Sequence, residues 1–155
     1  MKHRITEISA FTVIQPYAEV ILRHGKNVEN RQKNSRVRGY VAIHASKTNS
    51  RSWFEGCAED YGLTFDRSNV AFEAIVGFAK LVDVITKKEV TAKTRKWFQG
   101  RFGLVLEDPI VLKKPIPTMG ARGSWTLRGA PLKKALGQLS KSELLRIQKR
   151  NLDVF

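Results

Sequence analysis

The chain has 155 residues, 42% of them hydrophobic, a size and composition typical of one globular domain, expected to span residues 1–155. Its formal net charge of +14 predicts a polyanionic partner, with nucleic acid ahead of an anionic membrane surface. A single cysteine excludes an internal disulfide, and the three histidines show no zinc-ligand spacing, so no metal and no cofactor are expected. No apolar run reaches the ~18 residues of a membrane span and no signal-peptide pattern opens the chain, so we expect a cytoplasmic location.

The charge is distributed unevenly along the chain. Residues 51–85 have a local balance of −3, whereas basic residues concentrate at 23–38, at 87–101 and from 113 onward. If these three basic segments share a face, they would form a surface that binds phosphate groups. The alternative is that the lysines and arginines only solubilise the surface.

The first predicted elements are a strand, a helix and a second strand. Residues 9–14 favour a strand, and a short helix is expected to begin at Pro16, where a missing N–H costs nothing. Gly25 is placed to end this helix in a left-handed conformation. Residues 27–31 then predict a short strand, whose alternation puts Glu29 and Arg31 on the same side.

The middle of the chain predicts two longer strands and two helices. Residues 39–45 favour a central strand, and 73–85 a long strand with a bulge at Gly77. A helix capped by residue 49 or 50 and ended by Gly62 is expected to bury Trp53, Phe54, Cys57 and Tyr61. A capping-box sequence at 86–89 predicts a further helix that carries Trp97 and Phe98.

The last third predicts two more strands and a helical extension. Residues 102–106 and 110–112 favour a strand, and 113–123 a loop because of its prolines. Residues 124–127 favour the last strand, and 128–155 a C-terminal helical extension with a capping box at its Ser140. Helices scattered among strands with short connections predict an α+β fold, a small and mostly antiparallel barrel decorated with helices.

Three strongly polar residues, Lys26, Glu29 and Arg31, directly follow the first predicted helix. They form either a salt-bridge network or a functional site. Segment 15–31, taken with 38–45, resembles the ASCH domain family, in which a Gln-Pro-aromatic-Ala helix start precedes a Gly-Lys-like turn and Glu-x-Arg. The family's closing Gly-x-x-Gly-x-Trp is matched by residues 120–125, and the match runs in order from residue 9 to 127.

This resemblance implies a PUA-like fold, a small mixed, mostly antiparallel β-barrel surrounded by helices, and it implies RNA or nucleotide binding. Some members of the family are hydrolases, acting as ribonucleases or as amidohydrolases on acetylated cytidine. In such members the lysine of the Gly-Lys turn is an active-site residue, which carries over to Lys26. The short amidohydrolase-type members have threonine at the position of Glu29, so this chain departs from them there.

Lys26 and Glu29 each have two interpretations. The Lys26 ammonium would bind a phosphate or polarise a carbonyl, and as a neutral amine it would act as base or nucleophile. Its alternative is a purely structural ion pair with Glu29. The Glu29 carboxylate would accept hydrogen bonds from a base edge or act as general base, or it would orient Arg31 or Arg38.

The remaining candidates are polar or aromatic residues near the matched motifs. Tyr17 offers a ring on which a base would stack, and it is equally a candidate for the core. His44 is a candidate contact, with a role in the core or at the rim as the alternative. The Ser124 hydroxyl would meet a phosphate from the opposite wall of the cleft. We take as candidate catalytic residues Lys26, Glu29 and Ser124, and as candidate nucleic-acid contacts Tyr17, Lys26, Arg31, Arg38, His44 and Arg122.

Three functions therefore remain open from the sequence. The first is a protein that binds single-stranded RNA in a basic cleft centred on Lys26, with ribonuclease activity as an addition. The second is a small amidohydrolase acting on a modified nucleoside such as 4-acetylcytidine. The third is a protein-interaction or transcription-coregulator module that uses the basic C-terminal helix.

Overall fold

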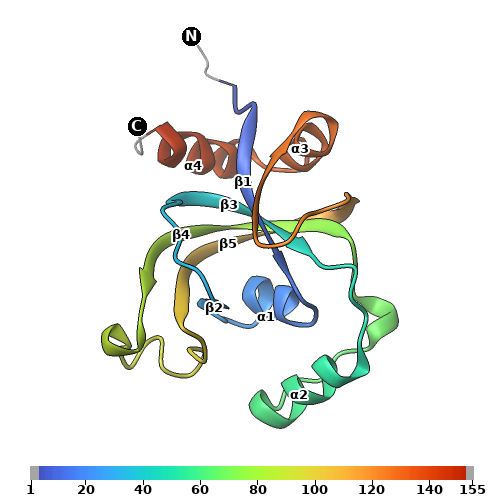
Figure 1. Ribbon diagram of the computed structural model, residues 1–155. Helices are drawn as coiled ribbons and strands as arrows, with labels where there is room; N and C mark the ends of the chain where they lie inside the picture. Colours follow the sequence, from blue (N-terminus) through green and yellow to red (C-terminus); the bar gives the residue numbers. More distant parts are fainter. Residues whose placement is uncertain (1–3, 153–155) are drawn as a thin grey trace.

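The computed structural model describes residues 4–152, which form one curved sheet with helices on both of its faces (Figure 1). The strands are β1 (Glu7–Val13), β2 (Val28–Arg31), β3 (Gly39–Ala45), β4 (Ala74–Ile85), β5 (Phe102–Pro117) and β6 (Ser124–Arg128). The α-helices are α1 (Tyr17–Arg23), α2 (Arg51–Tyr61), α3 (Gly129–Leu136) and α4 (Lys141–Leu152), and the 3-10 helices are η1 (Arg67–Asn69) and η2 (Lys87–Glu89).

The strand order is β2-β5-β4-β3-β1-β6, and four of the five neighbouring pairs are antiparallel. Among the neighbouring pairs, only β1 and β3 run parallel. Parallel strands cannot be joined by a two-residue hairpin, and the connection from β1 to β3 contains α1 and β2. The predicted mixed, mostly antiparallel α+β fold is therefore confirmed.

The two faces of the sheet carry separate apolar layers. Strand β3 is buried along its whole length, and its alternation sends Tyr40 and Ala42 to one face and Val41 and Ile43 to the other. On the first face α3 and α4 pack through Leu132, Ala135 and Ile147. On the second face α1 packs through Ala18, Ile21 and Leu22 (Figure 1).

Gly77 lies at the predicted irregularity in β4. The register of β4 against β5 shifts between Ile75 and Gly77, so the expected bulge is confirmed. A Cβ atom at this position would lie 2.8 Å from Leu22 Cδ2. Glycine therefore leaves room at this point for the Leu22 side chain of α1 and for the main chain of β5.

The predicted helix after residue 86 is wrong. The capping box is present, because the Thr86 amide donates to Glu89 Oε1 at 3.0 Å, but only the 3-10 helix η2 follows it. The next residues are β-branched, and the Thr91 amide donates to Thr94 Oγ1 at 3.0 Å in place of a helical carbonyl. The capping box therefore starts a helix that does not extend, because each further helical turn would have to compete with these local hydrogen bonds.

The loop predicted for 113–123 is wrong in its first part, because β5 continues without a break to Pro117, and only residues 118–123 form the connection to β6. Ile116 and Pro117 pair with Ile75 and Ala74 of β4, while β2 pairs only with residues 102–105 of β5. The distal half of β5 is therefore an edge strand, where a proline without an N–H can be accommodated.

The C-terminal helical extension predicted for 128–155 contains α3 and α4 as far as residue 152, and its last three residues lie outside the described part. Its capping box is present, because the Ser140 amide donates to Glu143 Oε1 at 2.9 Å and the Glu143 amide to Ser140 Oγ at 3.2 Å. Between residues 4 and 152, no helix is long and apolar enough to cross a membrane.

Candidate nucleic-acid binding site

A pocket of about 380 Å³ opens where α1, β2, α2 and the segment before β5 meet. Its aromatic side chains come from the two helices, and its charged side chains come from the turn after α1 and from β2. The lining residues are Thr12, Val13, Ile14, Tyr17, Lys26, Glu29, Asn30, Arg31, Gln32, Trp53, Tyr61, Gln99 and Gly100.

The start and the end of α1 are both fixed by hydrogen bonds. Gln15 is fully buried; its Oε1 accepts a hydrogen bond from the Glu19 amide at 3.1 Å, and its Nε2 donates to Ala71 O at 2.9 Å. After the helix Gly25 takes φ +76°, a conformation that favours glycine. The Lys26 amide then donates to Val20 O at 3.2 Å, which turns the chain back into β2 beneath the helix.

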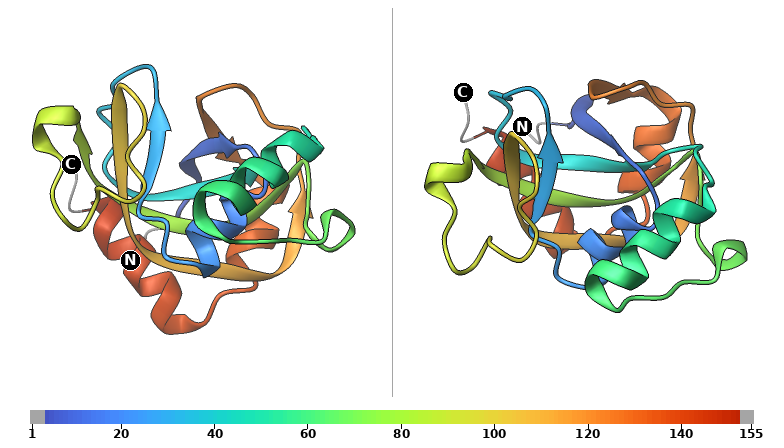
Figure 2. Two further views of the ribbon diagram at one scale, coloured as in Figure 1. Left: turned by 90° about the horizontal axis from the view of Figure 1, so that it is seen from below. Right: turned by 60° about the horizontal axis from the view of Figure 1, so that its bottom comes forward.

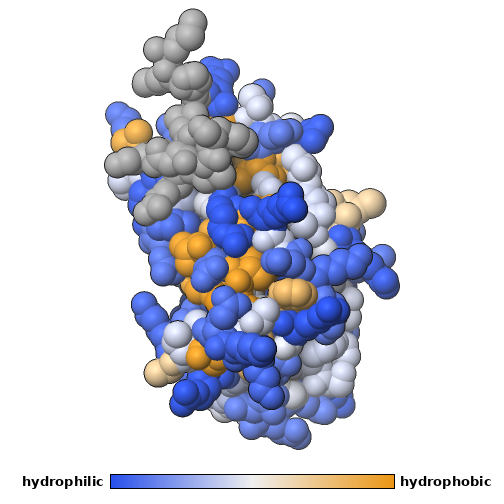
Figure 3. All heavy atoms as spheres, turned by 60° about the vertical axis from the view of Figure 1, so that its left-hand side comes forward, coloured by the Kyte–Doolittle hydropathy of each residue, from blue (hydrophilic) through white to orange (hydrophobic). Residues whose placement is uncertain are grey.

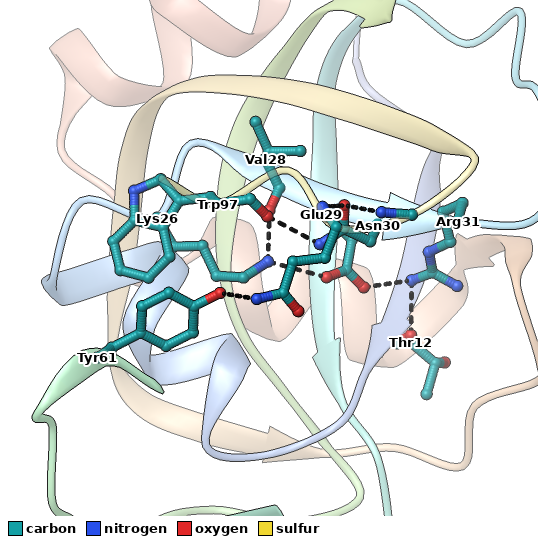
Figure 4. A network of polar contacts seen from close by, with 10 residues as sticks. Thr12, Lys26, Val28, Glu29, Asn30, Arg31, Tyr61 and Trp97 are labelled. Atoms are coloured by element: carbon teal, nitrogen blue, oxygen red, sulfur yellow. Dashed lines mark hydrogen bonds and ion pairs between the residues drawn. The ribbon is translucent and has the colours of Figure 1, made fainter. Parts of the chain in front are cut away.

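The charged side chains form one continuous row (Figure 4). Lys26 is only 4% exposed, and its Nζ donates to Val28 O and lies 3.3 Å from Glu29 Oε1. The second carboxylate oxygen, Glu29 Oε2, lies 3.1 Å from Arg31 Nη2, which also donates to Thr12 O at 2.7 Å. Glu29 is thus held between two cations, and this row combines donors and an acceptor at the base of the pocket.

Three aromatic rings form the wall beside this row. Tyr17 meets Trp53 edge-to-face at 6.3 Å between ring centroids and Tyr61 at 6.4 Å. Lys26 Nζ lies 5.6 Å from the centre of the Tyr17 ring. Trp53 is 44% exposed, so a large flat apolar surface remains open at the mouth of the pocket.

Both phenols of the wall are uncharged at neutral pH. Burial raises the pKa of Tyr17 to about 12, and the nearby Cys57 and Tyr61 add to this effect. Burial also raises the pKa of Tyr61, with Asp60 as the next cause. The neutral Tyr61 hydroxyl accepts a hydrogen bond from Gln99 Nε2 at 2.7 Å, which connects α2 to the segment before β5.

Asn30 holds that segment in place. Its Oδ1 accepts from the amides of Gln99 at 2.8 Å and Gly100 at 3.0 Å, and its Nδ2 donates to Trp97 O at 2.9 Å (Figure 4). One side chain on β2 therefore satisfies three backbone groups of the opposite loop, which gives the pocket a fixed third wall.

The structure brings together four of the predicted site residues, Tyr17, Lys26, Glu29 and Arg31, in this one pocket. It does not bring Arg38 there. The Arg38 Nη1 atom donates to Val37 O at 2.8 Å and to Ser35 O at 3.2 Å, within its own loop.

His44 is 2% exposed and is not among the pocket residues. It lies 2.6 Å from Thr118 O through Nε2 and 3.1 Å from Thr12 Oγ1 through Nδ1, and its ring meets Trp125 at 5.4 Å. Because Nε2 faces a carbonyl, it carries the proton of the neutral ring. Burial lowers the pKa of His44, so this neutral form connects β3 to the loop before β6.

Ser124 and Arg122 also lie away from the pocket. Ser124 is the first residue of β6, is exposed and pairs with Phe11, and Arg122 is exposed in the preceding loop. The wall expected from the Ser124 loop is formed instead by α2 and the segment ending at Gly100.

Sequence reasoning missed Trp53, Tyr61, Gln99 and Asn30 as pocket residues. The predicted α2 is confirmed in its bounds, and Phe54 and Cys57 are buried, but Trp53 lies at the surface. A signal was available in the spacing of Trp53 and Tyr61, eight residues apart and therefore on one face of a helix. No sequence signal marks Gln99 and Asn30 as pocket residues, because their roles depend on a contact between segments that are distant in the sequence.

No cluster of three or more side chains suited to holding a metal ion occurs in the part of the chain that the structure describes. The chain matches no protein-family profile and no curated protein sequence. Among solved structures it is similar to the ASCH protein of Zymomonas mobilis, with 16% identity and a TM-score of 0.49, over 85% of this chain and 95% of that one. A serine-to-alanine variant of ZmASCH from that organism gives 16% identity and a TM-score of 0.51, over 85% of this chain and 96% of that one. The second likeness, together with the mostly antiparallel sheet, shows that this chain has an ASCH-type, PUA-like fold.

Proposed function

We propose that this protein binds single-stranded RNA and takes one of its bases into the pocket beside Trp53. The observation that carries this proposal is the half-exposed Trp53 ring above the buried row of Lys26, Glu29 and Arg31. An exposed aromatic face binds any base by stacking, which is worth about 1–3 kcal/mol for each base. Unpaired bases offer such faces, whereas bases inside a duplex do not.

The polar groups of the pocket suit the edge of a base. Glu29 supplies carboxylate oxygens that accept from an amino or imino group, while Lys26 and Arg31 donate to carbonyl or phosphate oxygens. The volume of about 380 Å³ lies near the lower limit of small-ligand pockets, which fits one base with part of its sugar. The neutral Tyr17 and Tyr61 phenols add no negative charge that would oppose a phosphate.

The test is binding of labelled single-stranded RNA, measured by fluorescence anisotropy. We expect Trp53→Ala to weaken binding by roughly 5- to 150-fold, which is the affinity equivalent of about 1–3 kcal/mol. The matched control is Leu145→Ala, which removes another exposed apolar side chain, 62% exposed, from α4 on the opposite face of the sheet. Equal affinities of the Trp53 and Leu145 variants would contradict the proposal.

Hydrolysis is a second candidate, and the observation that favours it is the 3.3 Å contact of Lys26 Nζ with Glu29 Oε1 inside the same pocket. In such a site Glu29 would deprotonate a water molecule, and the Lys26 ammonium would stabilise the negative charge that develops on the attacked group. We expect Glu29→Gln to abolish turnover of single-stranded RNA or 4-acetylcytidine if the site is catalytic. If the wild-type protein turns over neither compound, this candidate fails and the binding function is unaffected.

A further inference from the structure

Two basic segments leave the sheet at the same end, directly beside the pocket. Arg31, the last residue of β2, pairs with Phe102, the first residue of β5, so the chain after β2 and the chain before β5 start from neighbouring positions. Figure 2 shows segments 32–38 and 90–101 at this end of the molecule. Gln32 from the first and Gln99 from the second line the pocket, and we call the two segments together the basic rim.

The basic rim has seven lysines and arginines and no acidic residue, an excess equal to half of the net charge of the chain. Six of these residues are exposed and only Arg38 is partly buried. None of them takes part in an ion pair of the described residues. The members of the rim are Lys33, Arg36, Arg38, Lys93, Arg95, Lys96 and Arg101.

The opposite side of the pocket has the opposite charge. Helix α2, which contributes Trp53 and Tyr61, carries three acidic residues against the single basic residue Arg51. A polyanion at the pocket is therefore attracted to one side and repelled by the other. This asymmetry favours an orientation of the strand in which its phosphates lie against the basic rim and its base points towards Trp53.

The rim is also held in position before any ligand binds. Asn30 fixes residues 97–100 through three hydrogen bonds, and Arg38 folds its own loop back through two. Lys96 Nζ lies 4.6 Å from the centre of the Trp97 ring and Arg101 Cζ 5.5 Å from that of Phe102. Figure 3 shows the side of the molecule that is on the left in Figure 1, and the side chains there are mainly hydrophilic and surround an apolar patch. The positive charges are thus attached to ordered backbone, which lowers the entropic cost of binding a chain of phosphates.

We infer that the basic rim binds the phosphodiester backbone of the RNA strand on either side of the base held in the pocket. This inference rests on the proposed function, and it adds where the strand runs. A second group of basic residues lies on β5, α3 and α4, from residue 113 onward. According to this inference, that group does not contact the RNA strand.

The experiment compares two triple variants of equal charge. Lys33→Gln, Arg36→Gln and Arg95→Gln together remove three exposed charges from the rim, and Lys114→Gln, Lys133→Gln and Lys134→Gln remove three exposed charges from the side of the sheet on which α3 and α4 pack. The affinity of each for labelled single-stranded RNA of mixed sequence is measured over a series of salt concentrations. Each lost phosphate contact lowers the slope of log affinity against log salt by ~0.7, so we expect the rim variant to lose about 2 in slope and the control variant to keep the wild-type slope.

Equal slopes for the two triple variants would overturn the inference, whether both decrease or neither does. The Trp53→Ala variant in the same series separates this failure from failure of the proposed function. Loss of the tryptophan is expected to lower affinity at every salt concentration without changing the slope, because stacking releases no counterions. If Trp53→Ala binds as wild type while the rim variant loses slope, the pocket assignment fails and the rim assignment stands.

Discussion

Arg31 on β2 donates a hydrogen bond from Nη2 to the main-chain oxygen of Thr12 on β1, at 2.7 Å, although these strands are four places apart in the sheet. The curvature of the sheet brings them together, and the Arg31 side chain spans the gap that no strand pair fills. Its guanidinium also lies 5.4 Å from the Phe11 ring. The residue that lines the pocket therefore also connects the edge strand β2 to β1, the strand next to the opposite edge of the sheet.

We expect Arg31→Gln to lower the free energy of unfolding by about 2 kcal/mol, because it removes a charged hydrogen bond and leaves Glu29 with one cation instead of two. Urea denaturation measures the change. The control is Arg36→Gln, an exposed arginine without an ion pair, for which we expect a change within about 0.5 kcal/mol. Equal stabilities of the two variants would show that the contact with Thr12 contributes nothing.

Replacing Asn30 should loosen the loop across the pocket. Asn30→Ala leaves the amides of Gln99 and Gly100 and the carbonyl of Trp97 without their partner. We expect faster hydrogen exchange of these two amides together with weaker RNA binding, since the third wall of the pocket loses its support. Asn69→Ala serves as control, because the Asn69 side chain donates to Asp66 Oδ2 at 3.3 Å and lies outside both the pocket lining and the rim. Unchanged exchange at Gln99 and Gly100 would contradict the role given to Asn30.

Two glycines should respond to alanine in opposite directions. A Cβ at Gly120 would lie 2.6 Å from His44 Nδ1, and His44 is held by its hydrogen bond to Thr118 O and by the Trp125 ring, so we expect a loss of about 1–3 kcal/mol in stability. A Cβ at Gly56, inside α2, would meet nothing within 4 Å, so we expect a gain of up to about 1 kcal/mol from helix propensity. Thermal unfolding of both variants checks the pair, and a stable Gly120→Ala protein would show that His44 is free to move.

The buried phenol of Tyr17 predicts a loss of stability in alkali. The pKa of Tyr17 is 10.0 in its ordinary state and about 12 in the folded protein, so between these values the folded chain keeps a proton that the unfolded chain releases. The free energy of unfolding therefore falls as the pH rises from 10 towards 12. Urea midpoints at about pH 9 and about pH 11 should differ less in Tyr17→Phe than in the wild-type protein. An equal decrease in both would contradict the assignment.

Local signals predicted the segment from α1 to β2 well, because each signal acts within a few residues. The glycine that ends α1, and the alternation that places Glu29 and Arg31 on one side, depend on backbone geometry alone. The helix itself begins at Tyr17, one residue after the expected Pro16.

The errors of prediction arise where a distant segment decides the outcome. Pro115 and Pro117 suggested a loop, but pairing with β4 on one side and a free edge on the other allow a strand there. Trp53 was expected in the core because its helix is amphipathic, yet α2 buries Phe54 and Cys57 and leaves Trp53 44% exposed. The wall opposite Lys26 was assigned to the Ser124 loop, since no local pattern reveals which segments Asn30 reaches.

Strand β6 completes the outer side of β1 by pairing from Glu7↔Arg128 to Phe11↔Ser124. The Thr12 hydroxyl in turn receives Trp125 Nε1 at 3.0 Å and donates to Ala121 O at 2.7 Å, while the Thr12 carbonyl receives Arg31. The first hundred residues therefore contain the whole pocket lining and the β3 partner of β1, whereas β6 and the bonds to Ala121 and Trp125 come from the part of the chain after Gly100. One wall of the pocket, the end of β1, is therefore held in part by residues that follow the last pocket-lining residue, Gly100, by more than twenty positions.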